Sequence, residues 1–166
     1  MVLNMNNIFP VTNVEDEFLM GKGLGITRVV MKLADEKVIS STVLQNDDEL
    51  FFPVDEINCL YTFEITFYVT NAASARGFKW KIDYPAGCIG TTTEWDSVDT
   101  LFEMVPVAST WASTAGGNNW YFILKGIIKT STTTGNVTFQ WAQSSAGANN
   151  TIVKAGSYLT YTKVNF

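Results

Sequence analysis

Histidine does not occur anywhere in the 166 residues. Its absence removes the commonest general base and the commonest metal ligand of enzymes. Hydrolysis through a Ser-His-Asp or a Cys-His arrangement is therefore excluded. A zinc site would have to combine two cysteines with carboxylates at a spacing that does not suit structural zinc. We expect a protein that is not an enzyme, with no catalytic residue, no metal ligand and no cofactor-binding residue.

Charge is also scarce. Charged residues make up 16% of the chain, against about 25% in an average soluble domain. Only 11 residues are Lys or Arg, they form no run, and the net charge is −5. Since a phosphate backbone attracts clustered positive charge, we expect no binding to nucleic acid. The polar surface must instead consist mainly of Thr, Ser, Asn and Gly, which suit β-sheet faces and their turns.

Long apolar runs are missing as well. No stretch approaches the roughly 18 uninterrupted apolar residues of a membrane helix. The first residues, Met-Val-Leu-Asn-Met-Asn-Asn, lack a basic region followed by an apolar run. We therefore expect neither a membrane span nor a secretory signal.

Cysteine is limited to Cys59 and Cys88, which are too few for a disulfide framework and too far apart for a CxxC site. We expect two reduced thiols, with Cys59 in the core, because free cysteine is so often buried. A bridge between the two remains the alternative.

Strict alternation of apolar and polar residues is the clearest pattern that is present. It occurs in residues 61–70, 78–84 and 137–141, and predicts strands with one buried face. Trp80 and Trp141 fall on the apolar phase and are predicted to be core. Weaker β patterns lie at residues 25–32, 37–44, 49–54, 100–107, 151–154 and 157–164, with turn residues at 46–48, 71–77, 84–87, 115–119, 134–136 and 144–150. Short strands separated by turns predict an all-β fold, a jelly-roll-like antiparallel β-sandwich.

Residues 120–129 are apolar on both faces of the expected strand. Such a run is typical of a central strand, or of one that a partner subunit covers.

The N-terminal residues lack this alternation. We interpret residues 1–23 as an attachment arm, with a short helical turn near residues 15–20, and residues 24–166 as the β-sandwich domain. A frayed terminus is an equal alternative for the arm. The Gly-Lys-Gly-Leu-Gly segment at residues 21–25 is interpreted as a hinge, because it lacks the spacing of a phosphate-binding loop.

Carboxylates gather at residues 47–49 and 94–99. Acidic residues in turns are usually solvated or cap the next element, and we expect that here. Two alternatives stay open: a cation site at Glu94, Asp96 and Asp99, or a pair among these and Glu103 that cleaves glycosidic bonds.

Three of the five tryptophans, Trp95, Trp111 and Trp120, lie in or beside predicted turns. Exposed rings there could stack on a glycan or contact a partner. Partial burial beneath loops or at a subunit contact is the competing interpretation.

Two segments resemble a module of tailed-bacteriophage structural proteins. In residues 41–54 and 61–64, a T-x-L-Q-x-D-D-x-L strand and turn precede a Y-x-F-E strand, and residues 135–143 with 151–159 resemble the closing hairpin of that module. The resemblance covers about residues 36–70 and 135–165 and implies no catalytic residue. It implies that Leu44 and Leu50 are core and that residues 46–48 shape a turn.

The resemblance also implies a function. Such modules occur in head fibres, capsid decoration proteins, and tail or receptor-binding proteins, and these virion proteins are commonly trimers. The expectation is therefore a virion structural protein, assembled in the host cytoplasm. It would be a homotrimeric β knob held to other virion proteins through the N-terminal arm. The alternative is a tail or receptor-binding module that recognises host surface glycans.

Overall fold

The computed structural model describes residues 25–71, 77–96, 103–106, 111–113 and 119–164, and these residues form strands and no helix. The strands are β1 (Thr27–Met31), β2 (Glu36–Ile39), β3 (Gln45–Val54), β4 (Leu60–Asn71), β5 (Phe78–Asp83), β6 (Ile89–Asp96), β7 (Glu103–Pro106), β8 (Trp111–Ser113), β9 (Asn119–Lys129), β10 (Gly135–Gln143), β11 (Asn150–Val153) and β12 (Tyr158–Val164). The all-β class predicted from the alternation is confirmed. The arm predicted at residues 1–23 lies outside the described residues.

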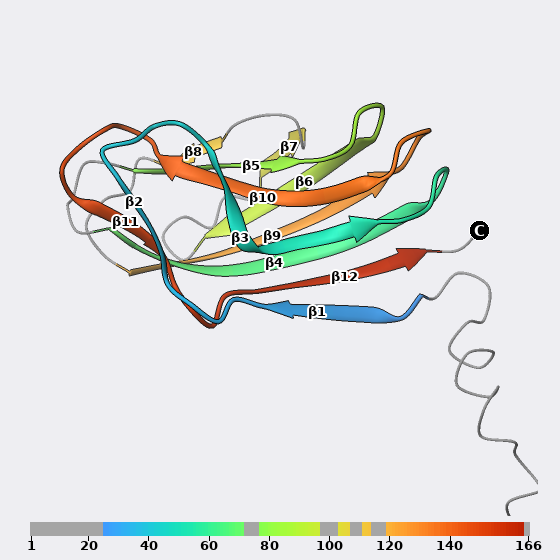
Figure 1. Ribbon diagram of the computed structural model, residues 1–166, viewed down its shortest axis with the longest axis horizontal. Helices are drawn as coiled ribbons and strands as arrows, with labels where there is room; N and C mark the ends of the chain where they lie inside the picture. Colours follow the sequence, from blue (N-terminus) through green and yellow to red (C-terminus); the bar gives the residue numbers. More distant parts are fainter. Residues whose placement is uncertain (1–24, 72–76, 97–102, 107–110, 114–118, 165–166) are drawn as a thin grey trace, which may run out of the picture.

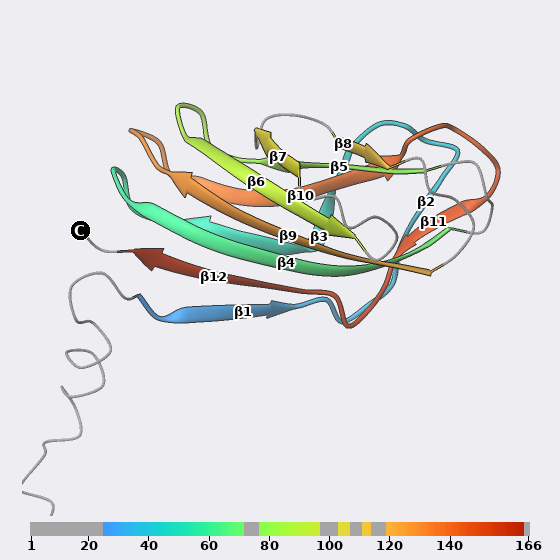
Figure 2. The same cartoon turned by 180° about the vertical axis from the view of Figure 1, so that it is seen from behind.

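The strands build two antiparallel sheets packed face to face. The larger sheet has the order β1-β12-β4-β9-β6-β7, with β11 joining β4 to β2, and the smaller has the order β3-β10-β5-β8. In Figure 1 the strands β3 and β10 lie in front of β4 and β9, and in Figure 2, from behind, β9 and β6 come to the front. The fold is thus a β-sandwich.

The pairings between the first and second halves of the chain are nested. β1 pairs with β12, β3 with β10, β4 with β9, and β5 with β8, all antiparallel. Pairs β12–β4 and β9–β6 then extend the larger sheet, and pair β10–β5 joins the smaller one. Almost every contact that holds the sandwich therefore joins distant parts of the sequence.

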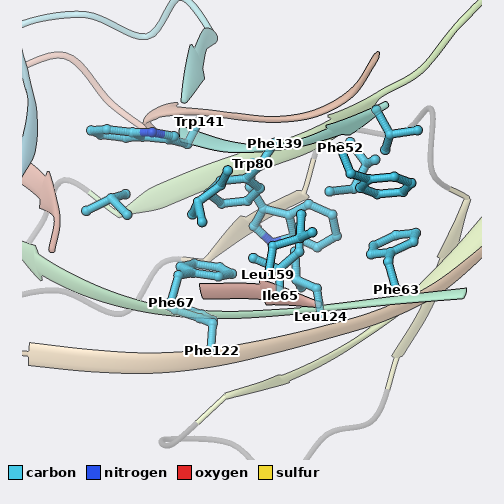
Figure 3. Packing of buried hydrophobic residues seen from close by; sticks show 14 of the residues in the cluster. Phe52, Phe63, Ile65, Phe67, Trp80, Phe122, Leu124, Phe139, Trp141 and Leu159 are labelled. Carbon is cyan, nitrogen blue, oxygen red and sulfur yellow. The ribbon is translucent and has the colours of Figure 1, made fainter. Parts of the chain in front are cut away.

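The core between the sheets is rich in aromatic side chains (Figure 3). Phe67 stacks on Phe122 with ring centroids 5.0 Å apart, and Phe139 of the opposite sheet approaches Phe67 at 4.7 Å. Trp80 and Trp141 are fully buried, as their alternation predicts. Burial of these large rings supplies most of the hydrophobic stabilisation.

Strand β9 lies between β4 and β6, which confirms the prediction that the doubly apolar run is a central strand. Trp120, Phe122, Leu124 and Ile128 face the core, whereas Tyr121 and Ile123 are half-buried on the outer face.

The turn expected at residues 46–48 is wrong, because these residues lie within β3. The register of β10 against β3 shifts there: Phe51 pairs with Thr138, and Asn46 with Gln140, so residues 47–50 form a bulge opposite Phe139. The Asp47 carboxylate accepts hydrogen bonds from the backbone N–H groups of Glu49 and Leu50, as in a turn. Turn chemistry is therefore present, but inside a strand.

Some other details also differ from the expectations. Strands β6 and β8 were not predicted. The strand expected at residues 37–44 is shorter, because β2 ends at Ile39 and residues 40–44 are not a strand. Leu50 is core, but Leu44 is only half-buried. Both cysteines are free; Cys88 is the buried one and Cys59 is half-buried. The placement of Cys59 in the core is wrong.

Three short turns lie together at one end of the sandwich, on the right of Figure 1. They connect β3 to β4, β5 to β6, and β9 to β10. The Asn58 N–H donates to the Ser131 carbonyl, and the Thr133 hydroxyl donates to the Ala86 carbonyl. In the turn between β5 and β6, Gly87 has φ +81° and the Cys88 N–H donates to the Pro85 carbonyl. This turn geometry favours glycine at position 87.

Candidate functional site

A buried ionic cluster surrounds Lys32, which follows β1. The Lys32 ammonium lies 2.9 Å from Asp47 Oδ1 and 2.8 Å from Glu36 Oε2, with Glu49 Oε2 at 3.6 Å. The side chains of Lys32 and Asp47 are 1% and 0% exposed. Trp141 Nε1 donates to the second Asp47 oxygen at 3.2 Å.

The pKa values in this cluster reflect its burial. For Lys32, burial disfavours the charge, but the hydrogen bonds and charges of Glu36 and Asp47 outweigh it and raise the pKa. The pKa of Glu36 is also raised, mainly by burial. A lysine kept protonated by carboxylates is neither a base nor a nucleophile at neutral pH. Gln45, which donates to Glu36, lies in β3 together with Asp47.

The three tryptophans proposed as glycan contacts, Trp95, Trp111 and Trp120, lie on three different strands. Trp120 is 5% exposed and packs edge-on against Phe122 at 6.0 Å, so its indole offers almost no surface to a sugar. In the backbone register Trp95 of β6 pairs with Ile123, whereas Trp111 of β8 pairs with Trp80 in the other sheet. The side chains of Trp95 and Trp111 lie outside the described residues.

Three of the carboxylates proposed for a cation or a glycosidic bond, Glu94, Asp96 and Glu103, lie on strands. Glu94 pairs with Glu103 in the register of β6 and β7, and Asp96 pairs with Phe122. Asp99 lies outside the described residues. Where side chains are described, no three cysteines or carboxylates are grouped as ligands of one ion.

The outer face of the larger sheet is built mainly from threonine. A groove of about 540 Å³ crosses β1, β12, β4, β9 and β6 there, and its lining includes Thr27, Thr62, Thr91, Thr160 and Thr162. One ion pair, between Lys125 and Glu64 at 2.9 Å, crosses it. Hydroxyl groups thus keep this face polar with little charge, as the composition predicts.

A second hollow lies farther along β4 and β9, and of the three candidate tryptophans it includes Trp120. It has a volume of about 520 Å³ and is lined by Tyr68, Val69, Thr70, Asn119, Trp120, Tyr121 and Lys154. Tyr68 and Tyr121 are direct partners across the two strands, with ring centroids 5.3 Å apart and planes at 51°. We name this feature the tyrosine hollow.

Two signals in the sequence could have indicated the tyrosine hollow. Tyr68 occupies the polar phase of β4, among threonines and a glutamate, and is 42% exposed. Tyr121 belongs to the run that is apolar on both faces. An aromatic ring on the solvent-exposed face of a strand indicates a possible contact surface, because the core does not require a ring at that position.

Comparison with known proteins adds no relative: no family model, no curated protein and no solved structure matches the chain. In the described part of the chain no helix is long and apolar enough to cross a membrane.

Proposed function

We propose that this protein is a non-enzymatic structural component of a bacteriophage virion, a head fibre or capsid decoration protein that displays a trimeric β knob. The observation that carries the proposal is the nested strand pairing of the sandwich. We assign this order to the jelly roll, in which a long antiparallel ribbon is rolled into two sheets. Jelly rolls are common in viral capsid and lectin domains.

The chemistry of the motif residues supports the same proposal. Asp47, Gln45 and Leu50, which carry the resemblance to phage proteins, fix β3 against β2, β10 and Lys32 by buried contacts. Their role in this chain is to build the sandwich and not to perform a reaction. That role suits a protein whose function is to assemble and present a surface.

Exposed apolar side chains on an edge strand favour an oligomer. Val29 and Met31 of β1 are 62% and 52% exposed, and β1 lies at the edge of the larger sheet. Edge strands and apolar surface are features that proteins usually cover. A homotrimer would cover them, and residues 1–23 would attach the knob to other virion proteins.

The proposal is tested by mass and by attachment. We expect the purified chain to have the mass of a trimer by light scattering behind size exclusion, and to bind to phage particles that lack it. A variant that begins at residue 24 should still be a trimer but should not bind the particles. A stable monomer that does not bind particles would contradict the proposal.

A second candidate function is a tail or receptor-binding module that recognises host surface glycans. The tyrosine hollow favours it, because the exposed ring of Tyr68 and the half-buried ring of Tyr121, beside amide and hydroxyl groups, suit a saccharide. The two functions are compatible in one virion protein.

A further inference from the structure

The tyrosine hollow offers aromatic surface that is open to solvent. Its size falls within the range of about 300–1,000 Å³ that is usual for small-molecule sites. The tilted rings of Tyr68 and Tyr121 present a concave apolar surface on the outer face of the sheet. The core packing of the sandwich does not require it, since the outer face is opposite the core. A sugar unit presents a face of C–H groups that can lie against such rings.

Polar groups lie beside the rings. The Thr70 hydroxyl donates to Asn119 Oδ1 at 3.1 Å, which orients the amide so that its N–H groups can donate to a ligand. Burial, followed by the neighbouring Tyr158, raises the pKa of Tyr121, whose hydroxyl also forms a hydrogen bond with Thr66. The hollow therefore combines stacking surface with donors and acceptors suited to sugar hydroxyls.

Charge in the hollow is nearly balanced. Among the described residues that line it, Lys154 carries the one charge, and this ammonium is paired with Asp35. The chain as a whole has a net charge of −5. Because the described lining residues direct no unpaired cation at the ligand, a neutral saccharide fits better than an anionic one.

We propose that the tyrosine hollow is a binding site for a neutral saccharide, in which Tyr68 is the stacking platform and Asn119 and Tyr121 bond the sugar hydroxyls. This proposal rests on the second candidate function and gives it a site. The virion structural role stands without it.

The test is binding of the full chain to an array of immobilised neutral oligosaccharides built from glucose, galactose, mannose and their N-acetyl derivatives. We expect binding to a subset, which is then titrated in solution. Tyr68→Ala should weaken the affinity at least about tenfold, the usual loss when an aromatic anchor of a binding site is truncated. Tyr68→Phe keeps the ring and should retain most of the affinity.

The matched control is Phe51→Ala, which removes an aromatic ring of similar exposure, 38%, from β3 in the other sheet. It should leave the affinity unchanged, and circular dichroism should show that all variants are folded. The proposal is overturned if the wild-type chain binds no neutral saccharide, or if Tyr68→Ala binds as tightly as the wild type. Attachment of Tyr68→Ala to phage particles should be normal, which separates failure of this site from failure of the virion role.

Discussion

The ammonium of Lys32 lies 2.9 Å from a carboxylate oxygen of Asp47, and the two buried side chains link the end of β1 to the bulge in β3. Glu36, at the start of β2, accepts a second hydrogen bond from the same ammonium. The cluster joins three strands at the point where the chain passes from the edge of the larger sheet into the smaller one. A buried ion pair stabilises the fold only while both partners are present, because removal of one leaves the other charge buried without a counterion.

We predict that Lys32→Met lowers the free energy of unfolding by about 3–5 kcal/mol, since it leaves buried carboxylates without their cation. Urea denaturation followed by tryptophan fluorescence measures the change. The matched control is Lys125→Met, which removes the exposed ion pair with Glu64 and should cost about 0–1 kcal/mol. Equal losses of unfolding free energy for the two variants would show that the buried cluster stabilises the fold no more than an exposed ion pair does.

This cluster also shows why part of the fold was not predictable. Alternation in β4, β5 and β10 identifies the core phase, because the alternating apolar positions, such as Phe67, Trp80 and Phe139, face the opposite sheet. The acidic segment at residues 46–48 has the composition of a turn. It is held in a strand by Lys32, a partner from outside its own pattern, together with Trp141 of β10. A local pattern cannot contain information on such distant contacts.

Strand β6 was missed for a related reason. Its inward positions include Gly90 and Thr92, so it lacks the large apolar residues that mark a strand. Small residues fit at these positions because side chains of the neighbouring strands fill the core beside β6. The ring of Phe63, for example, lies over Gly126 of β9. The tyrosine hollow likewise arises from the register that brings Tyr68 opposite Tyr121.

A pH dependence is expected from Tyr61, whose hydroxyl donates to Asp55 at 2.8 Å. Burial first, and then the hydrogen bond and charge of Asp55, raise the pKa of Tyr61 above its ordinary value of 10.0. The unfolded chain therefore loses this proton at lower pH than the folded chain does. Stability from this group is complete below about pH 10 and is lost as the pH rises toward the folded-state pKa.

Above pH 10 the unfolding free energy of Tyr61→Phe should therefore fall less steeply with pH than that of the wild type. At pH 7 the loss of the hydrogen bond should cost about 0.5–1.5 kcal/mol. Urea denaturation at a series of pH values up to 11 measures both effects. Parallel pH profiles for the two proteins would contradict this assignment.

The two thiols should differ in reactivity. Cys88 is buried, and Cys59 is half-buried beside Glu56, with its pKa raised by burial and then by that carboxylate. We predict that a thiol reagent at neutral pH modifies Cys59 slowly and Cys88 only on unfolding, since the thiolate is the reactive form. Cys59→Ser should remove the slow native phase. In denaturant without a reductant both thiols should react, whereas a bridged pair would not.

The last prediction concerns Gly126 in the central strand β9. A Cβ atom placed there would overlap the ring of Phe63 and lie 2.8 Å from Thr92 Cγ2, on the inner face of the sheet. Gly126→Ala should therefore destabilise the protein by about 1–3 kcal/mol through overpacking, although alanine is no worse than glycine in an unobstructed strand. If the Phe63 ring is the obstacle, Phe63→Leu should relieve part of this cost. The double variant should then be more stable than the sum of the single changes predicts, by about 0.5–3 kcal/mol.

Phe67→Leu is the control for this cycle, because Phe67 stacks on Phe122 elsewhere in the same core. Its effect should add to that of Gly126→Ala within about 0.3–0.5 kcal/mol. Coupling of equal size to both phenylalanines would mean that the strand shifts as a whole and not that one ring obstructs it. Coupling to Phe63 alone would establish that a glycine in the middle of the sheet is required by the aromatic ring packed over it.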